Sequence, residues 1–140
     1  IEEFLLVLTN RVADVTGGVS QNAPRWFAEA CSAAQSQSVF SKGATGFIAA
    51  AGRSHEHVCR TCKVFTGLTP SEYVNQVRIE YAAHLLRSDE RSIDDVVNAC
   101  GFDNSSYFYR LFRRQYGTTP RKYRLENQRD PFQLVDQGTK

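Results

Sequence analysis

The sequence predicts an all-α protein in which two helix-turn-helix subdomains are joined by a long linker helix. Three observations support this prediction. Apolar residues recur with the helical period of 3.6 residues, and the strict apolar/polar alternation of a half-buried strand is absent from the sequence. Helix start and stop signals follow one another closely from Ser41 onward. A pattern of Arg, Gly, Thr-Pro and Tyr near residue 110 also occurs, in weaker form, fifty residues upstream.

Length and composition set the outer limits. The chain has 140 residues, 41% hydrophobic and 23% charged, which is typical of one ordinary globular domain or two very small ones. Its longest apolar run, FLLVL, is too short to span a bilayer, and no signal-peptide pattern opens the chain. The four cysteines lack the dense spacing of a disulfide scaffold. We therefore expect a protein of the cytoplasm and nucleoid, with reduced thiols and no membrane partner.

The first forty residues divide at a glycine pair. Residues 1–16 have a helical apolar stripe that stops at Gly17 and Gly18, and the chain starts at Ile1 without any Met. We expect residues 1–21 to be the end of an upstream sensor or dimerisation domain plus a linker. Pro24 is suited to the first position of the next helix, which has an amphipathic face. Residues 22–129 are predicted to form the main domain, and residues 130–140 a tail.

The first helix-turn-helix is expected at about 44–67. One helix should end at Gly52, and Ser54 can cap a second helix that ends at Gly67. Thr69 as N-cap and Pro70 at the first helical position then open the linker helix, 70–88. Eighteen residues of α-helix, 70–87, measure about 27 Å.

The second helix-turn-helix is expected at about 92–117. Ser92 and Asp95 have capping-box spacing before a short apolar run that stops at Gly101. A helix over 105–116 follows and ends at Gly117, after which the Thr-Pro pair at 119–120 opens a last short helix.

A shift of fifty positions superimposes the two halves. Arg60, Gly67, Thr69, Pro70 and Tyr73 then fall on Arg110, Gly117, Thr119, Pro120 and Tyr123. Each copy is a helix, a Gly-containing turn, a second helix and a capped helix after it. The second helix of such a motif can enter the DNA major groove.

The side chains of the second copy favour this interpretation. On a helical wheel, Tyr107, Phe108, Leu111 and Phe112 form a core face, whereas Ser106, Tyr109, Arg110 and Arg113 lie opposite. The equivalent outward face of the first copy is Glu56, Cys59, Arg60 and Lys63. Arginine suits bidentate contact with guanine, serine many base edges, and glutamate cytosine. A helix face that is merely solvated is the alternative for Arg110 and Arg113.

Charge is distributed unevenly. Residues 1–40 carry two Lys and Arg against four Asp and Glu, a net −2, and residues 41–129 carry fourteen against nine, a net +5. This asymmetry favours a polyanion such as double-stranded DNA as partner of the second part. Predicted phosphate contacts, which position the protein without reading sequence, are Lys63, Arg113, Arg114, Arg121 and Lys122.

Residues 41 to about 129 resemble the DNA-binding domain of the AraC/XylS family of bacterial transcription regulators. The most specific match is IDDVVNACGFDNSSYFYRLFRRQYGTTPRKYR, residues 93–124, which follows the family's second helix-turn-helix. The first copy departs from the family pattern, because Cys62 stands where an aromatic residue is usual and Gly46 lies inside a helix. These departures concern how well ordered the first helix-turn-helix is and how tightly it binds DNA, and they leave the predicted fold unchanged. The sequence around residues 10–12 and 24–27 is also similar to regulators of chitobiose or cellobiose utilisation.

The resemblance implies a homeodomain-like domain of seven helices that binds asymmetric DNA sites and, in most members, activates transcription by contacting RNA polymerase. It also implies an upstream domain for a small-molecule effector, often a sugar. The base-contacting positions of the family fall here on Glu56, Cys59, Arg60, Ser105, Ser106, Tyr109 and Arg110.

The sequence allows three other interpretations: a metal site, an enzyme and an adaptor that binds protein. His55, Cys59 and Cys62 share a helical strip that could hold a metal, but no second cysteine pair completes a structural zinc motif. No nucleophile elbow, phosphate loop or paired-carboxylate motif indicates an enzyme, so we predict no catalytic residues and no cofactor. A helical adaptor that binds protein alone is the remaining alternative, and it predicts no salt-dependent affinity for DNA.

Overall fold

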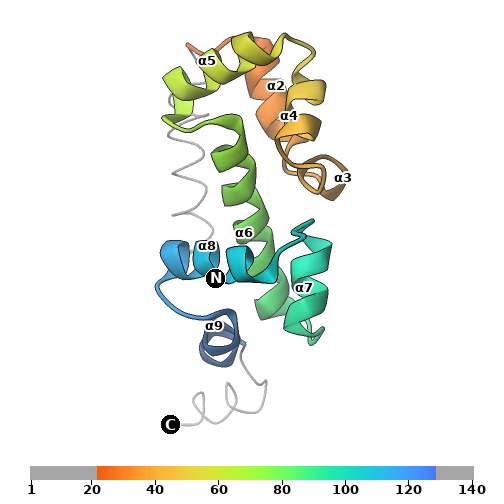
Figure 1. Ribbon diagram of the computed structural model, residues 1–140, viewed down its shortest axis with the longest axis vertical. Coiled ribbons are helices and arrows are strands. Elements are labelled where there is room, and N and C mark those ends of the chain that lie inside the picture. The colour runs from red at the N-terminus through yellow and green to blue at the C-terminus, as the bar shows by residue number, and fades with distance from the viewer. Residues whose placement is uncertain (1–21, 129–140) are drawn as a thin grey trace, which may run out of the picture. The chain divides into compact units, whose positions relative to one another are not determined.

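The computed structural model describes residues 22–128, and within that range the chain forms eight helices and no strand (Figure 1). The all-α prediction is therefore confirmed. The helices are α2 (Arg25–Ala33), α3 (Gln37–Phe40), α4 (Gly43–Ala51), α5 (His55–Thr66), α6 (Pro70–Ser88), α7 (Ile93–Ala99), α8 (Ser105–Tyr116) and α9 (Pro120–Asn127). None of them is long and apolar enough to cross a membrane. The expectations for residues 1–21 and for the tail lie outside the described residues.

The chain divides into two compact units, with the boundary inside α6 at Glu80 and Tyr81. The described part of the first unit holds α2 to α5 and the first part of α6. The second unit holds the rest of α6 and α7 to α9. Each unit contains one of the two predicted helix-turn-helix copies.

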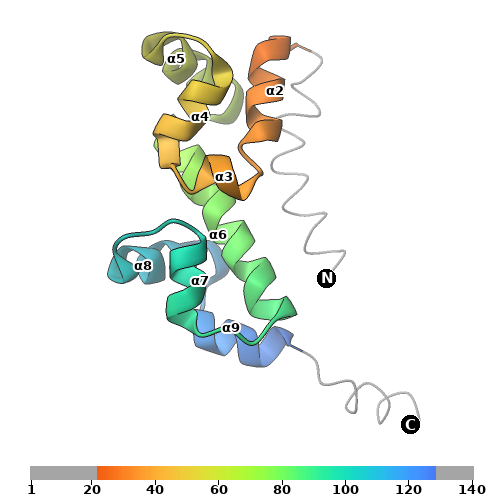
Figure 2. The same cartoon turned by 90° about the vertical axis from the view of Figure 1, so that its right-hand side faces the viewer.

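In the first unit, α2 packs beside α4, and α5 contacts both (Figures 1 and 2). Phe27 of α2 and Phe47 of α4 are fully buried, with ring centroids 6.3 Å apart, and Phe47 lies 5.1 Å from the ring of Tyr73. Since α2 supplies Phe27, Ala30 and Cys31 to this core, it is an integral part of the first unit. Pro24 is the N-cap of α2 and not its first helical residue as predicted, because its ψ of 141° is not helical.

Helix α3 was not predicted from the sequence, and tertiary contacts link its end to α6. Arg78 of α6 donates from Nε to the Phe40 carbonyl at 2.7 Å and from Nη2 to the Ser41 carbonyl at 3.1 Å. These bonds satisfy carbonyl groups at the end of α3 that have no partner within the helix.

Gly46 is the second feature of the first unit that the sequence pattern does not explain. A Cβ at this position would lie 2.5 Å from the Val39 carbonyl oxygen and 2.9 Å from Cβ of Lys42. Glycine is therefore required because α4 approaches the backbone of α3 too closely for any side chain.

The predicted helix boundaries coincide with capping bonds. Ser54, Thr69, Ser92 and Thr119 each accept a hydrogen bond from the backbone N–H three residues on, and Glu72 closes a capping box by accepting from Thr69 N at 2.9 Å. Helices α5 and α8 end at Gly67 and Gly117, whose φ of +76° and +74° favour glycine. The capping residues and glycines predicted from the repeat thus form helix caps and left-handed turns in both copies.

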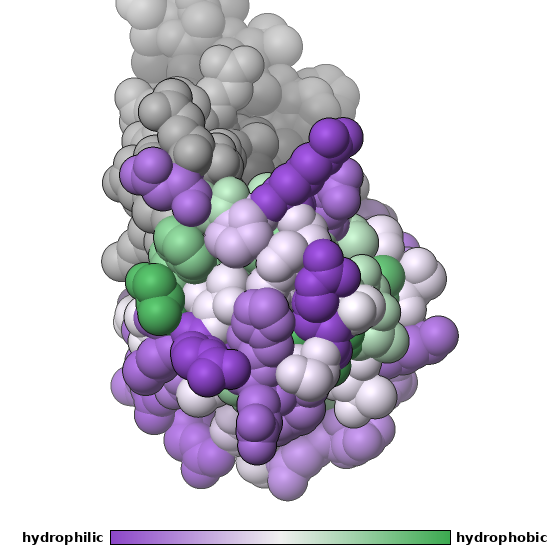
Figure 3. All heavy atoms as spheres, turned by 90° about the horizontal axis from the view of Figure 1, so that it is seen from above, coloured by the Kyte–Doolittle hydropathy of each residue, from purple (hydrophilic) through white to green (hydrophobic). Residues whose placement is uncertain are grey.

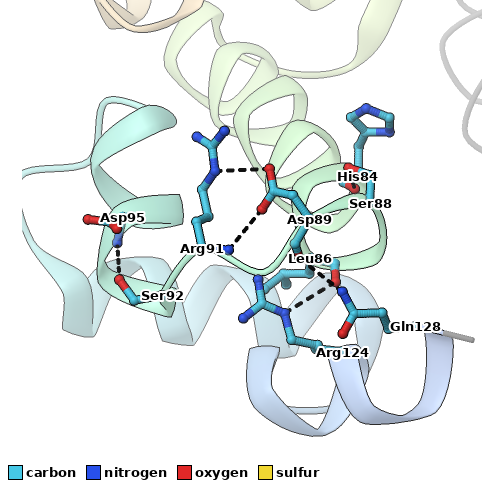
Figure 4. A network of polar contacts seen from close by, with 9 residues as sticks. All are labelled: His84, Leu86, Ser88, Asp89, Arg91, Ser92, Asp95, Arg124 and Gln128. Atoms are coloured by element: carbon cyan, nitrogen blue, oxygen red, sulfur yellow. Dashed lines mark hydrogen bonds and ion pairs between the residues drawn. The ribbon is translucent and has the colours of Figure 1, made fainter. Parts of the chain in front are cut away.

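In the second unit, α8 contacts α7 and α9 around an aromatic core. The Phe112 ring is fully buried and lies 5.9 Å from the Phe108 ring and 5.4 Å from the Tyr123 ring. Two bonds attach α9 and the residue after it to the end of α6 (Figure 4): Arg124 Nε donates to the Leu86 carbonyl at 3.3 Å, and Gln128 Nε2 to the Asp89 carbonyl at 2.9 Å.

Candidate nucleic-acid interface

Helix α8 presents one buried and one exposed face, as its sequence predicts. Phe108 and Phe112 have no exposed surface, while Tyr107 and Leu111 are half-buried. On the opposite side Ser105, Ser106, Tyr109, Arg110 and Arg113 are exposed. The buried aromatic rings hold the helix rigidly against the unit, so that its polar face is displayed in one orientation.

The start of α8 is held by a cap that sequence reasoning missed. Asn104 Oδ1 accepts a hydrogen bond from the Tyr107 backbone N–H at 3.1 Å. Asparagine directly before a helical pattern is a known N-cap signal, so the information was in the sequence. The cap places Ser105 and Ser106 in the first turn, and in helix-turn-helix proteins residues near this end of the helix contact base edges.

Arg110 is held over an aromatic ring. Its guanidinium carbon lies 5.1 Å from the centroid of the Tyr107 ring, one turn earlier in α8. Stacking of this kind restricts a long side chain while its N–H groups stay available for hydrogen bonds. Arg110 therefore has the chemistry for bidentate contact with guanine at the end of an ordered side chain.

Helix α5 has the same two faces in the first unit. Val58 and Cys62 have no exposed surface, and Glu56, Arg60 and Lys63 are exposed. Cys59, which was expected on the exposed face, is half-buried, and its Sγ lies 3.7 Å from Nδ1 of His55. Cys62 takes the core position that Phe112 takes in the second copy, and the neighbouring helix α2 contributes rings to the same core.

All five side chains predicted to contact phosphate are exposed: Lys63, Arg113, Arg114, Arg121 and Lys122. Among residues 22–128, ion pairs join Arg25 to Glu29 and Arg91 to Asp89, and neither pair includes one of the five cations. Arg124, another cation of this cluster, is half-buried and bonded to the Leu86 carbonyl, which gives it a structural role. Figure 3 looks onto the first unit, where the surface consists mainly of hydrophilic side chains with small hydrophobic patches between them.

The groups with shifted pKa values are buried in the cores of the two units. Burial raises the pKa of the Cys31 thiol from 9.0 to about 12 and raises the pKa of Tyr73 above its ordinary value. It also raises the pKa of the Cys62 thiol and of the Tyr123 phenol, although a hydrogen bond from Arg87 partly offsets the latter shift. These four groups are protonated at neutral pH and act as neutral packing groups.

The metal-binding alternative requires three side chains to converge, and within residues 22–128 no three His, Cys, Asp or Glu side chains do so. His55 and Cys59 are in contact on the outside of α5. Cys62 is in the core, where its Sγ lies 3.5 Å from Oγ1 of Thr66.

Comparison with known proteins finds helix-turn-helix proteins both among protein families and among individual relatives. A family profile described as a helix-turn-helix domain matches residues 47–126, which is more than half of the chain. The HTH-type transcriptional activator RhaS of Escherichia coli (strain K12 / DH10B) is 46% identical over 65 residues, covering 46% of this chain and 23% of RhaS. The chain thus matches about a quarter of the length of these curated relatives.

Two solved structures resemble the fold. The structure of the xylose-binding transcription activator XylR superimposes with a TM-score of 0.66 at 27% identity, covering 76% of this chain and 28% of XylR. The C-terminal domain of AraT, a response regulator from Geobacillus stearothermophilus, also superimposes with a TM-score of 0.66, at 23% identity, covering 78% of this chain and 91% of that domain. The AraT likeness concerns the fold alone.

Proposed function

Because this chain belongs to the AraC/XylS family of helix-turn-helix transcription regulators, we propose that it is the sequence-specific DNA-binding part of a bacterial transcription activator. In this proposal α5 and α8 each enter the major groove of double-stranded DNA, in successive grooves of one asymmetric site. Phosphate contacts from the surrounding cations position the two helices, and the groove-facing side chains read the bases.

The observation that carries the proposal is the exposed face of α8. Ser106, Tyr109 and Arg110 are exposed on the side opposite the buried rings of Phe108 and Phe112. Arg113, Arg114, Arg121 and Lys122 are exposed on α8 and α9 without a described acidic partner. An ordered reading face flanked by unneutralised cations is what a groove-binding helix requires.

The first unit supports a second, different reading face. Its exposed residues Glu56 and Arg60, with half-buried Cys59, differ in chemistry from the serines and tyrosine of α8. Two unlike faces would recognise two unlike blocks of sequence, so the site is proposed to be asymmetric. Gly46 and Cys62, the departures noted in the sequence, are both accommodated in the packing of this unit.

The other partners follow from the family and belong to the proposal only. Contact with RNA polymerase would account for activation. A small-molecule effector, for which a sugar is one candidate, would bind another part of the full regulator, as the name of the xylose-binding activator XylR suggests for that protein. The cytoplasm, and the nucleoid within it, is the compartment in which such a protein would act.

The proposal is tested by selection from a random duplex library with the purified protein at moderate salt. Two preferred blocks about one helical turn apart would support both reading faces. A single block would restrict sequence reading to one unit. No enrichment, together with no binding to any duplex at low salt, would overturn the proposal in favour of an adaptor that binds only protein.

A further inference from the structure

Trp26 of α2 lies at the start of the first reading helix. It is the single tryptophan of the chain and is half-buried. Its ring centroid is 5.0 Å from the imidazole of His57, in the first turn of α5. The guanidinium carbon of Arg53 lies 5.2 Å from the same ring centroid. Helix α2 thus provides an aromatic platform for a cation that directly precedes the N-cap of α5.

Arg53 has features that solubility alone does not require. It is exposed, and the described ion pairs do not include it, although Glu56 follows three residues later. The Trp26 ring restricts its long side chain in advance, which lowers the entropy lost when the guanidinium binds a ligand. One guanidinium nitrogen, Nη1, donates a long hydrogen bond to the Gly52 carbonyl at 3.4 Å, and the remaining N–H groups match the oxygen atoms of a phosphate.

The corresponding turn of the second unit, residues 101–104, contains no arginine. The repeat places Gly52 on Gly101 and the N-cap Ser54 on the N-cap Asn104, so that the single residue Arg53 corresponds to two residues, Phe102 and the exposed Asp103. Phe102 is 5% exposed and lies 5.4 Å from the Phe108 ring, which means that it is a core residue. Between Gly52 and its N-cap the first unit instead has an exposed cation, and α2 places the Trp26 ring beside it.

We propose that Arg53, positioned by the Trp26 ring, is a further DNA-phosphate contact of the first unit. The inference rests on the proposed function, because it needs α5 to approach a duplex. Arg53 directly precedes Ser54, the N-cap of α5, so it lies at the end of the helix that begins the exposed series Glu56, Arg60 and Lys63. Trp26 is a positioning residue that acts through Arg53.

The test uses anisotropy of a labelled duplex of about three helical turns, taken from the library selection, over a series of salt concentrations. Arg53→Ala should weaken binding roughly five- to tenfold near 0.1 M salt and should lower the slope of log affinity against log salt by about 0.9. Arg25→Ala is the matched control, since Arg25 is an exposed arginine of α2 that is paired with Glu29 at 3.3 Å. It should leave affinity and slope unchanged.

Trp26→Leu should weaken binding in the same direction, and the double variant with Arg53→Ala should be no weaker than Arg53→Ala alone. Thermal unfolding followed by circular dichroism establishes that each variant is folded. If Trp26→Leu fails to fold, the comparison of Arg53→Ala with Arg25→Ala still decides the question, because both side chains are exposed.

Three outcomes would overturn the inference. If the unaltered protein binds no duplex at low salt, the proposed function fails and this inference fails with it. If the unaltered protein binds but Arg53→Ala keeps its affinity and salt slope, only the inference about Arg53 fails. An equal loss in Arg25→Ala would mean that overall charge, and not a positioned guanidinium, lowers the affinity.

Discussion

Arg87 of α6 donates a hydrogen bond from Nη1 to the phenol oxygen of Tyr123 in α9, at 2.6 Å. Tyr123 is 5% exposed, and its ring packs against Phe112 of α8. The bond therefore connects three helices of the second unit through one side chain. The Arg87–Tyr123 bond thus stabilises the aromatic core against which α8 packs.

Tyr123→Phe should lower the free energy of unfolding by about 1–3 kcal/mol, because it removes one hydrogen bond of the half-buried, charged Arg87. Denaturant titration followed by circular dichroism measures this change. Tyr109→Phe is the control, since Tyr109 is exposed and should lose little stability. Equal stability of the two variants would show that the Arg87 bond contributes nothing net.

Arg110→Ala should weaken binding to the selected DNA site by about 1–3 kcal/mol and relax the preference at one base pair. The reason is that a stacked, exposed guanidinium in the reading face is lost. Competition binding with single-base variants of the site measures both effects. Full affinity and unchanged preference in this variant would show that α8 meets DNA with another face.

Arg121→Ala should weaken binding to all sequences alike and lower the salt slope by about 0.9, as expected for the loss of one phosphate contact. Arg121 is exposed in the first turn of α9, outside the proposed reading face. The measurement compares the selected site with an unrelated duplex at several salt concentrations. A loss confined to the selected site would instead assign Arg121 to base reading.

Gly46→Ala should destabilise the first unit by about 1–3 kcal/mol, although alanine is normally favoured over glycine in a helix. The added Cβ would lie 2.5 Å from the Val39 carbonyl oxygen, so α3 or α4 must move. Thr45→Ala, an exposed change in the same helix, should be neutral or slightly stabilising. Thermal unfolding of the two variants compares them directly, and a Gly46→Ala protein that gained stability would contradict the close approach.

Alkaline pH should destabilise the protein. The native state keeps the Cys31 proton up to about pH 12, whereas the unfolded chain loses it near pH 9.0, so the contribution of Cys31 to folding stability is constant below that pH and falls above it. Tyr73 acts in the same direction above pH 10.0. Between about pH 8 and about pH 10.5, the fall in unfolding free energy should be about 1–2 kcal/mol smaller in Cys31→Ala than in the unaltered protein. Identical pH profiles would show that Cys31 is not the titrating group.

The sequence alone determined the local structure of this protein. Ser54, Thr69, Ser92 and Thr119 are N-caps as predicted, and Gly67 and Gly117 end α5 and α8. These features were predictable because capping bonds and left-handed turns involve residues only a few positions apart. The opposed faces of α8 follow for the same reason, since the helical period decides which side chains share a side.

Only the tertiary structure decided the features that depend on segments far apart in the chain. Arg78 bonds to carbonyls 37 and 38 residues away at the end of α3, while Arg124 bonds to the Leu86 carbonyl and so has a structural role. The requirement for glycine at 46 and the stacking of Arg53 on Trp26 also arise where separate helices meet. No local pattern encodes such contacts, because they depend on how the apolar faces of whole helices pack together.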